Sequence, residues 1–383
     1  MRKSVLFVNP AYHYSFTLRD ELRRLGWKAE IYKNAIFPKQ LLFSRDVLQE
    51  EAIGAGARWL PFETLKRLWF FLRRIIGYGY FVIYGDAEVF TVNRNPGSRL
   101  VRLLTAGARS PELRMLKLLG KKVIFFPNGC HQELLKKDFG KHESGNVCRN
   151  CVVPEAVCND KENQRIFDLV NRYHDLVIAN TPMDSPSLPQ KRQIRFLSLD
   201  LEQFRPDMAI PESLQLPKTS KIRILHSFVD EGRQQDEKNV KGSPFIVRAI
   251  RRLEAEGYPV EYMYLNNVPS RDMRFLQVQA DIVVDQLIYG WWGSTAIEGM
   301  GLGRPVVCYL TPWIKQRFLD AFPEYDGLPI VEATPATIYE VLKRLVEDEP
   351  YRLAKGREAR AFAERHFDVR KNAPAFAELL GTL

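Results

Sequence analysis

Short apolar runs alternate with amphipathic stretches along the chain. A short apolar run between polar residues is typical of a buried strand, and apolar residues three and four positions apart are typical of a helix. In the first half this pattern predicts strands at 4–8, 28–32, 80–84, 122–126, 176–179 and 194–197, with helices at 15–25, 111–119 and 161–172. Strands that alternate with helices indicate a doubly wound parallel sheet.

The second half continues this alternation after a polar, proline-containing stretch at 205–218. The pattern predicts strands near 222 and at 260–265, 282–285 and 306–310, and tail helices at 335–346, 350–366 and 374–380. A chain of 383 residues is long for a single core, so two domains are expected. The predicted fold class is therefore α/β with two parallel-sheet domains.

The most informative segment is 281–310, in which an apolar strand enters a glycine-bearing loop, a short helix follows, and a second apolar strand ends the unit. The amino end of a helix at the carboxyl end of a strand favours anions, because free backbone N–H groups and the helix dipole point there. The amides of Gly293, Ser294 and Thr295 are therefore expected to hold phosphate. Glu298 is the only carboxylate of that helix and is expected to accept hydrogen bonds from sugar hydroxyls.

A matching unit lies upstream, where a predicted strand ends at His226 and a polar loop leads into an amphipathic helix. Ser243 is expected to cap this helix. Lys241 and Gly242 then lie just before a second helix amino end, and two such ends in one sheet indicate a nucleotide diphosphate. Arg233 in the loop is a further candidate for donor contact. His226 is another, although a satisfied core histidine fits its position equally well.

These motifs resemble the carboxyl-terminal half of retaining glycosyltransferases of the GT-B fold, the group-1 or family 4 class. The resemblance rests on the Lys-Gly pair at 241, on the strand-loop-helix unit that ends in Glu298, and on Gly303-Arg-Pro-Val-Val307. The segment 199–206 also resembles the interdomain segment of that class. The resemblance thus covers the chain from about Asp175 to its end.

The resemblance implies two Rossmann-like domains with a cleft between them. We expect an acceptor-side domain at 1–205, a donor-binding domain at 218–366, and a terminal helix at 367–383 that crosses back onto the first domain. His13 follows the first predicted strand, in a loop that borders the cleft in the resembled fold. An acceptor-side role is therefore expected for it.

The resemblance also implies roles for single residues. Lys241 matches the lysine that holds the donor diphosphate, and Glu298 matches the second glutamate of a Glu-x7-Glu motif, which binds the donor ribose. The first glutamate of that motif is absent, because Gly290 stands eight positions before Glu298. Asp285 and Gln286, at the end of the preceding strand, are candidate substitutes for contact with the donor sugar.

The implied activity is transfer of a hexosyl or related group from a nucleotide diphosphate donor to a saccharide or lipid-linked hydroxyl acceptor, with retention and in cell-surface polysaccharide or glycoconjugate assembly. Lys241 and Glu298 are the candidate catalytic residues, and transfer needs no metal cofactor. Two other classes stay open: a non-catalytic sugar-nucleotide binder and a basic, zinc-containing nucleic-acid-binding protein. The cations are spread through the chain and match no nucleic-acid-binding motif, so no nucleic acid partner is expected. An inverting transferase or a sugar epimerase is a rival among enzymes.

The site residues also have simpler interpretations. Thr295 and Glu298 have capping-box spacing, so Glu298 could serve only to satisfy the amino end of its helix. Lys241 alone could be a solvated lysine, and the residues 303–305 could be an ordinary turn. The order and spacing of these features within one domain favour the functional interpretation.

The net charge of +10 implies acidic partners, such as nucleotide-sugars or an anionic membrane. The segment 66–76 interleaves cations with aromatic and bulky apolar residues, as an interfacial helix does; packing on the first sheet is the alternative. No apolar run reaches the roughly 18 residues that a membrane-spanning helix needs. The first apolar run is too short for a signal peptide. We therefore expect a cytoplasmic protein with peripheral contact at the inner face of the cell membrane.

Three of the five cysteines, Cys148, Cys151 and Cys158, lie close together in a polar stretch. A Cys-x2-Cys pair with further cysteine and histidine nearby is the composition of a tetrahedral zinc site. The fourth ligand would be one of Cys130, His131 or His142. Free thiols in a packed loop are the alternative. Cys308 lies in an apolar strand, where a buried small hydrophobic residue is expected.

Overall fold

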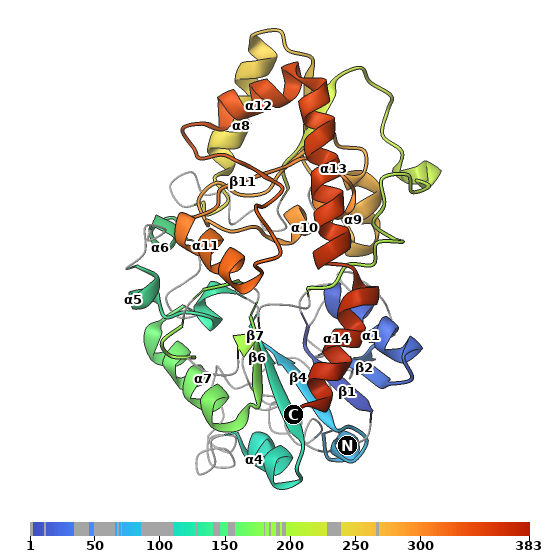
Figure 1. The fold of residues 1–383 in the computed structure, drawn as a ribbon, viewed down its shortest axis with the longest axis vertical. Helices are drawn as coiled ribbons and strands as arrows, with labels where there is room; N and C mark the ends of the chain where they lie inside the picture. Colours follow the sequence, from blue (N-terminus) through green and yellow to red (C-terminus); the bar gives the residue numbers. More distant parts are fainter. Residues whose placement is uncertain are drawn as a thin grey trace.

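The computed structural model describes residues 3–10, 13–33, 46–49, 66, 69, 71–85, 110–127, 129–140, 146–151, 158–179, 181–183, 185–188, 192–193, 197–227, 239–265 and 268–383. These residues form two separate parallel sheets with helices on both faces (Figure 1). The α/β fold class predicted from the alternation of strands and helices is therefore confirmed.

The first sheet has seven strands in the order β3-β2-β1-β4-β5-β6-β7. Their bounds are β1 (Ser4–Val8), β2 (Lys28–Lys33), β3 (Leu48–Gln49), β4 (Tyr80–Tyr84), β5 (Lys122–Phe126), β6 (Leu176–Ile178) and β7 (Arg192–Gln193). Every residue of β1 is buried, because helices cover both faces of the sheet. Val5 and Phe7 face α1 (Tyr14–Arg24), while Leu6 and Val8 face α4 (Pro111–Leu118), α7 (Asp160–Tyr173) and the helical residues 71–75.

The second sheet has five strands in the order β12-β11-β10-β8-β9. Their bounds are β8 (Ile222–Leu225), β9 (Val260–Met263), β10 (Ile282–Val284), β11 (Val306–Cys308) and β12 (Ile330–Glu332). The helices α8 (Ser243–Ala255) and α12 (Ile338–Glu347) pack on one face. The other face is covered by α10 (Ser294–Gly301), α11 (Pro312–Ala321) and α13 (Glu349–His366). The helix α9 (Ser270–Gln277) precedes β10.

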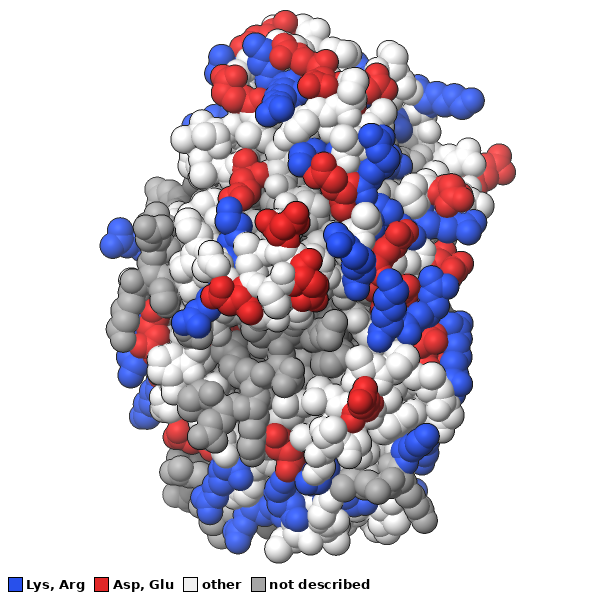
Figure 2. All heavy atoms as spheres, in the orientation of Figure 1, with Lys and Arg blue, Asp and Glu red and all other residues white. Residues whose placement is uncertain are grey.

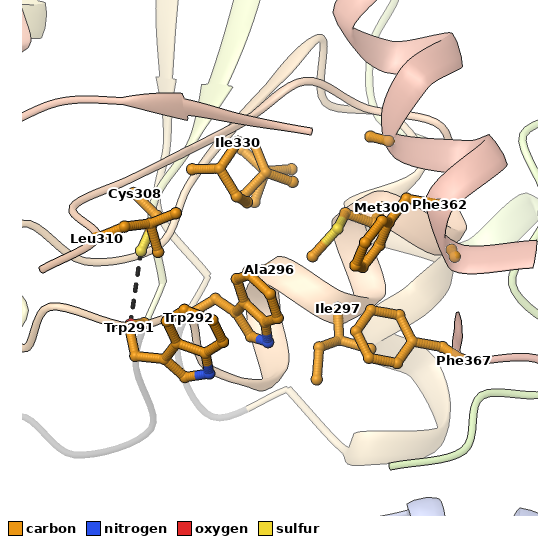
Figure 3. Packing of buried hydrophobic residues seen from close by; sticks show 14 of the residues in the cluster. Trp291, Trp292, Ala296, Ile297, Met300, Cys308, Leu310, Ile330, Phe362 and Phe367 are labelled. Atoms are coloured by element: carbon orange, nitrogen blue, oxygen red, sulfur yellow. Dashed lines mark hydrogen bonds between the residues drawn. The ribbon is translucent and has the colours of Figure 1, made fainter. Parts of the chain in front are cut away.

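The two tryptophans of the glycine-bearing loop belong to this core. Trp291 and Trp292 are 1% and 6% exposed, and their rings stack with centroids 3.9 Å apart. They lie below Cys308 and Leu310 and beside α10 (Figure 3). Cys308 is fully buried, as predicted. The tryptophan rings therefore fix the loop against the sheet, and the start of α10 is held in place by packing.

The chain returns to the first sheet at its end. The helix α14 (Val369–Gly381) lies along α1 (Figure 1), and its Phe376 stacks on Phe7 of β1 with ring centroids 6.3 Å apart. The sequence pattern placed the start of this helix at Pro374, because proline lacks the N–H that a helix interior uses. The helix instead begins at Val369, where the side chain of Asp368 accepts a hydrogen bond from the Arg370 amide. Burial of Val369 against the first sheet supports this earlier start.

Smaller elements complete the described fold: η3 (Cys130–Gln132), α5 (Lys136–Phe139), α6 (Asn146–Arg149) and η5 (Glu212–Leu214). The bounds of β1, β4 and β5 equal those predicted from the sequence. The strand β7 precedes the predicted range 194–197, most of which lies outside the described residues. Among the residues that the structure describes, no helix has the length and apolar character needed to cross a membrane.

Candidate functional site

Three backbone segments converge beyond the carboxyl end of β10: the start of α8, the start of α10 and the residue Asp285. Lys241 Nζ lies 2.7 Å from Asp285 Oδ1, and the amide of Gly293 donates to Asp285 Oδ2 at 2.5 Å. The Asp285 side chain is fully buried, whereas the Lys241 side chain is 15% exposed. Asp285 therefore anchors the ammonium group beside the amino end of α10. A β-carbon at Gly293 would lie 3.2 Å from Asp285 Oδ2, so the close approach favours glycine here.

This arrangement changes the expected roles of two residues. Each carboxylate oxygen of Asp285 has a partner within the protein, so Asp285 positions Lys241, and its contact with the donor sugar stays a prediction. The Gly293 amide is used by Asp285, which leaves the next amides, those of Ser294 and Thr295, to face an anion. Amides of the first helical turn have no partner within their own helix.

The start of α8 is capped differently from the prediction. The side-chain oxygen of Asn239 accepts hydrogen bonds from the amides of Lys241 and Gly242, at 3.0 and 3.1 Å. Gly242 adopts a left-handed conformation with φ of 75°, and Ser243 begins the helix without capping it. The predicted Ser243 cap is therefore wrong, because the left-handed turn at Gly242 brings Asn239 over the helix end. The Lys-Gly pair lies at this helix end, as its position in the sequence implied.

Glu298 lies one turn into α10, with its side chain 13% exposed. Gln277 Nε2, at the end of α9, donates to Glu298 Oε2 at 2.5 Å. Burial raises the pKa of Glu298 to about 7, and the hydrogen bond from Gln277 opposes this rise. The capping-box interpretation is wrong, because Gly293 is the N-cap and no side chain caps the helix. Glu298 is thus held at the domain interface by a buried amide.

The first sheet reaches this site through the loop after β1. His13 Nδ1 lies 3.5 Å from Glu298 Oε1, and the Tyr14 hydroxyl donates to the carbonyl of Ser294 at 3.4 Å. The His13 ring also stacks on Phe204, with centroids 5.2 Å apart. His13 was expected on the acceptor side, and the structure places it against the carboxylate expected to bind the donor. The site therefore includes residues from both domains.

His13 is neutral at physiological pH. Burial, aided by the positive charge of Arg274, lowers its pKa to about 3. The contact between His13 and Glu298 is therefore not an ion pair near pH 7. A neutral imidazole can still donate or accept one hydrogen bond at each ring nitrogen, according to its tautomer.

His226 and Gln286 make hydrogen bonds with the backbone segments that form the site. His226 is fully buried, with Nδ1 2.9 Å from the Val284 carbonyl and Nε2 2.8 Å from Ser243 Oγ. Burial lowers its pKa to about 4. This arrangement favours the core-histidine interpretation, in which the ring ties β10 to the start of α8. Gln286 Nε2 donates to the Trp291 carbonyl at 2.5 Å, so it holds the loop, and its contact with the donor sugar stays a prediction.

Gly290 explains why the first motif glutamate is absent. Its φ is +86°, and a β-carbon there would lie 2.5 Å from Thr311 Cγ2. Positive φ is costly for residues with a side chain. The turn that leads to Trp291 therefore excludes a glutamate at position 290, and any contact with the donor sugar must come from elsewhere.

Two residues separate the site predicted from the sequence from the site that the structure describes. Arg233 lies outside the described residues. Gln277 was not predicted, although it is 2% exposed and contacts Glu298 directly. Its position at the end of a helix before β10 gave no motif by which to find it. Its contact joins the end of α9 to a residue of α10 that lies 21 positions later in the chain.

The cysteine cluster contains none of the candidate donor-site residues, and Cys130 and Cys148 pack against the core that holds Trp291 and Trp292. Burial raises the pKa of Cys130 to about 12, and the nearby thiols of Cys158, Cys151 and Cys148 add to this rise. The Cys130 thiol therefore lies near the other three. Within the described part of the chain, no three His, Cys, Asp or Glu side chains are arranged to hold a metal ion. The side chain of His131 and all of His142 lie outside that part, and the zinc hypothesis stays a prediction.

The arrangement of two parallel sheets, with a terminal helix that returns to the first, is the GT-B fold of glycosyltransferases. The chain matches no protein-family model and no curated protein sequence. Its similarity is to solved structures over their full length.

Three of these structures illustrate the similarity. Anabaena HepE in complex with UDP and glucose has a TM-score of 0.60 and 14% identity, with 100% of both chains covered. Sucrose-phosphate synthase from Thermosynechococcus elongatus has a TM-score of 0.62 and 14% identity, covering 100% of this chain and 99% of that one. The catalytic domain of starch synthase IV from Arabidopsis thaliana, bound to ADP and acarbose, has a TM-score of 0.56 and 10% identity, covering 98% of each chain. The predicted GT-B fold is thus confirmed, whereas the family 4 assignment stays a prediction.

Proposed function

We propose that this protein transfers a glycosyl group from a nucleotide diphosphate sugar to a hydroxyl acceptor. The observation that carries the proposal is the convergence of Lys241, the amino end of α10 and Glu298 beyond the carboxyl ends of the second sheet. In open parallel sheets, ligands bind at this edge. The solved structures of HepE and starch synthase IV contain UDP and ADP, which supports a nucleoside diphosphate as the ligand class.

The proposed roles follow from charge. Lys241 and the amides of Ser294 and Thr295 contact the diphosphate, and Glu298 accepts hydrogen bonds from the ribose hydroxyls. The bond from the anomeric carbon to the phosphate oxygen breaks, while a bond forms to the acceptor oxygen. The departing phosphate oxygen takes the acceptor proton, so the protein needs mainly to stabilise the growing negative charge of the leaving group. Retention of configuration belongs to this proposal.

The acceptor side is formed by the first domain. The proposal places a saccharide or lipid-linked hydroxyl acceptor between His13 and the remaining carboxyl ends of the first sheet, in cell-surface polysaccharide or glycoconjugate assembly. His13 reaches Glu298, so an acceptor held near His13 would also be near the donor.

The test combines binding and turnover. A ligand that binds only the native state raises the apparent melting temperature, so nucleoside diphosphates and their sugar conjugates are screened by thermal shift. The stabilising donor is then incubated with candidate acceptors, and release of nucleoside diphosphate is measured. Stabilisation by one nucleotide base together with donor consumption supports the proposal. Absence of stabilisation by every nucleotide contradicts it.

A second candidate function is a non-catalytic sugar-nucleotide binder. The observation that favours it is Gly290, whose conformation excludes the motif carboxylate. Donor binding without hydrolysis or transfer, over a broad set of acceptors, would select this candidate. Product anomer analysis separates a retaining transferase from an inverting one.

A further inference from the structure

Exposed apolar side chains gather on one end of the first domain. Among the described residues, six of the eight exposed large hydrophobic side chains belong to this domain: Leu25, Trp69, Leu72, Ile76, Leu118 and Leu119. The other two are Tyr264 and Leu353. Single exposed apolar residues are normal, but a group of them marks an interaction surface.

The described residues of the segment 66–76, which are helical at 66, 69 and 71–75, are apolar on two opposite sides. Phe71 and Ile75 are buried against the first sheet, so the packing interpretation of this segment is confirmed for that side. Trp69, Leu72 and Ile76 are 56%, 36% and 75% exposed. Their spacing of three and four residues puts them on one stripe of the helix, away from the sheet. Packing alone does not account for that second stripe.

Further exposed apolar residues lie in the turns that precede β2, β4 and β5, at the same end of the first domain as this stripe. Leu25 lies just before β2, Ile76 before β4, and Leu118 and Leu119 before β5, where Leu118 is 85% exposed. In the sheet order β2-β1-β4-β5, the turns before β4 and β5 are neighbours, and the turn before β2 lies one strand further along the same edge. The Lys122 amide bonds to the Gly79 carbonyl, which joins the last two turns directly. We call these four residues together with Trp69 and Leu72 the strand-entry surface.

The same turns are strongly basic. The residues 22–28, 73–79 and 117–122 contain eight cations and no acidic residue: Arg23, Arg24, Lys28, Arg73, Arg74, Lys117, Lys121 and Lys122. Five of these cations pair with acidic side chains of flanking residues: Arg23 with Asp20 and Asp46, Arg24 with Glu21, Arg74 with Glu30, and Lys117 and Lys122 with Asp175. Lys28, Arg73 and Lys121 have no acidic partner within the described part of the chain. Lys and Arg side chains also gather at the lower end of the face shown in Figure 2, where α4 lies in Figure 1.

We propose that the strand-entry surface docks on an anionic lipid bilayer. Separate apolar side chains surrounded by cations fit a membrane interface, because the former insert among the lipid chains and the latter contact anionic headgroups. Arg73 lies over the Trp69 ring at 4.6 Å, which brings a cation and an interfacial aromatic side chain to one point. The charge favours a membrane over a second copy of this basic chain.

The geometry also sets the orientation. His13 follows the carboxyl end of β1 and contacts Glu298, whereas the strand-entry surface lies at the amino ends of the parallel strands. The bilayer would therefore contact the end of the first domain opposite the candidate site, and the site would stay open to solution. Membrane docking and donor binding are thus independent properties.

Vesicle sedimentation of the full chain tests this proposal. Wild type should sediment with vesicles of phosphatidylcholine containing phosphatidylglycerol and much less with phosphatidylcholine alone, and added salt should release it. Ile76→Glu and Leu118→Glu should each weaken binding roughly tenfold or more, because each replaces an inserting apolar group by an anion. Leu353→Glu is the matched control, since Leu353 is 50% exposed on α13 of the other domain, and it should bind as wild type does.

The outcomes separate this proposal from the others. Failure of wild type to bind anionic vesicles, or equal binding by Ile76→Glu, overturns it. A dimer in sedimentation velocity that Ile76→Glu converts to monomer, without vesicle binding, identifies a second copy as the partner instead. Nucleotide-induced thermal shift should be the same in wild type and Ile76→Glu, so loss of docking is distinguishable from loss of the proposed activity.

Discussion

His13 Nδ1 lies 3.5 Å from Glu298 Oε1, and this contact joins the loop after the first strand to a helix that begins 281 residues later. The environment shifts the pKa of both side chains away from the ordinary value of the residue. Burial lowers the pKa of His13 to about 3 and raises that of Glu298 to about 7. The interface between the domains thus carries a carboxyl group that titrates near physiological pH.

Glu298→Gln should remove a pH dependence of nucleotide binding. If ionised Glu298 accepts hydrogen bonds from ribose, affinity for a nucleoside diphosphate should rise as pH increases through about 7. A charge-assisted hydrogen bond contributes roughly 1.5–3 kcal/mol, so the variant should bind about tenfold to a hundredfold more weakly at pH 8. Calorimetric titration between pH 6 and pH 8, with the nucleotide's own ionisation common to both proteins, measures the difference. Equal affinities would place the ribose elsewhere.

The same residue should affect stability in the opposite direction. A pKa raised above its ordinary value means that the folded state holds the proton more tightly than the unfolded state. The free energy of unfolding should therefore decrease as pH rises from about 4.5 to about 7 and then level off. Glu298→Gln should lack this component when unfolding by urea is measured across the range.

Gln277→Ala tests whether a buried amide positions Glu298. Burial is the larger influence on the Glu298 pKa, and the hydrogen bond from Gln277 lowers it. Removal of that bond should shift the midpoint of the affinity curve to higher pH. Gln279→Ala is the matched control, because the Gln279 amide donates to the carbonyls of Leu214 and Phe275. The control should lose stability with no shift of the midpoint. A shift of the same size in both variants would mean that Gln277 acts on the Glu298 pKa only through the stability of the fold.

Lys241→Ala should lower the rate of transfer by roughly two orders of magnitude, as loss of one preorganised electrostatic group does. It also leaves Asp285 buried without its partner, which costs about 3–5 kcal/mol of stability. Asp285→Asn in the Lys241→Ala background should recover stability but not rate. Lys315→Ala, which removes an exposed pair with Glu332, should change neither much. An unchanged turnover in Lys241→Ala would remove this residue from the site.

The zinc prediction rests on Cys148, Cys151 and Cys158, with a fourth ligand near them. If the site forms, protein purified without chelators should carry about one zinc per chain by elemental analysis, and Cys151→Ser should release it. Loss of the metal should destabilise the first domain, because metal binding is coupled to folding. Cys308→Ser, which replaces a fully buried thiol of β11 that is not a candidate ligand, is the control for metal content. Metal-free protein with reactive thiols would end the hypothesis.

The sequence predicted the site as far as local pattern reaches. Lys241 and Glu298 follow strands of one parallel sheet, and such strands bring their carboxyl ends to the same edge. The pattern could not predict that Asp285 holds Lys241, because that contact depends on how the loop folds around Trp291 and Trp292.

The contacts of Glu298 were also beyond local pattern. Gln277 reaches it from the end of α9, 21 positions earlier in the chain, and His13 reaches it across the two domains. Such partners have no fixed spacing along the chain, so no motif could contain them. The capping-box spacing indicated that Glu298 would pair with the amino end of its own helix near Thr295. The structure excludes that pairing, because Gly293 is the N-cap of the helix.

Gly290→Ala tests the account of the missing motif glutamate. An alanine at φ of +86° should cost roughly 1–2 kcal/mol from the backbone alone. Its β-carbon would also lie 2.5 Å from Thr311 Cγ2, so the measured loss should exceed that value. Gly26→Ala isolates the backbone part, because Gly26 has φ of +81° and no atom within 4 Å of an added β-carbon.

The Thr311→Ser background removes the colliding methyl group and keeps the hydroxyl that bonds to the Gly290 carbonyl. In that background the cost of Gly290→Ala, measured by urea unfolding, should decrease to the value found for Gly26→Ala. Gly290→Glu, which restores the residue of the resembled class, should destabilise at least as much as Gly290→Ala and should not raise the rate of transfer. A stable Gly290→Glu protein with higher activity would show that this turn can adopt a conformation with a carboxylate facing the donor sugar.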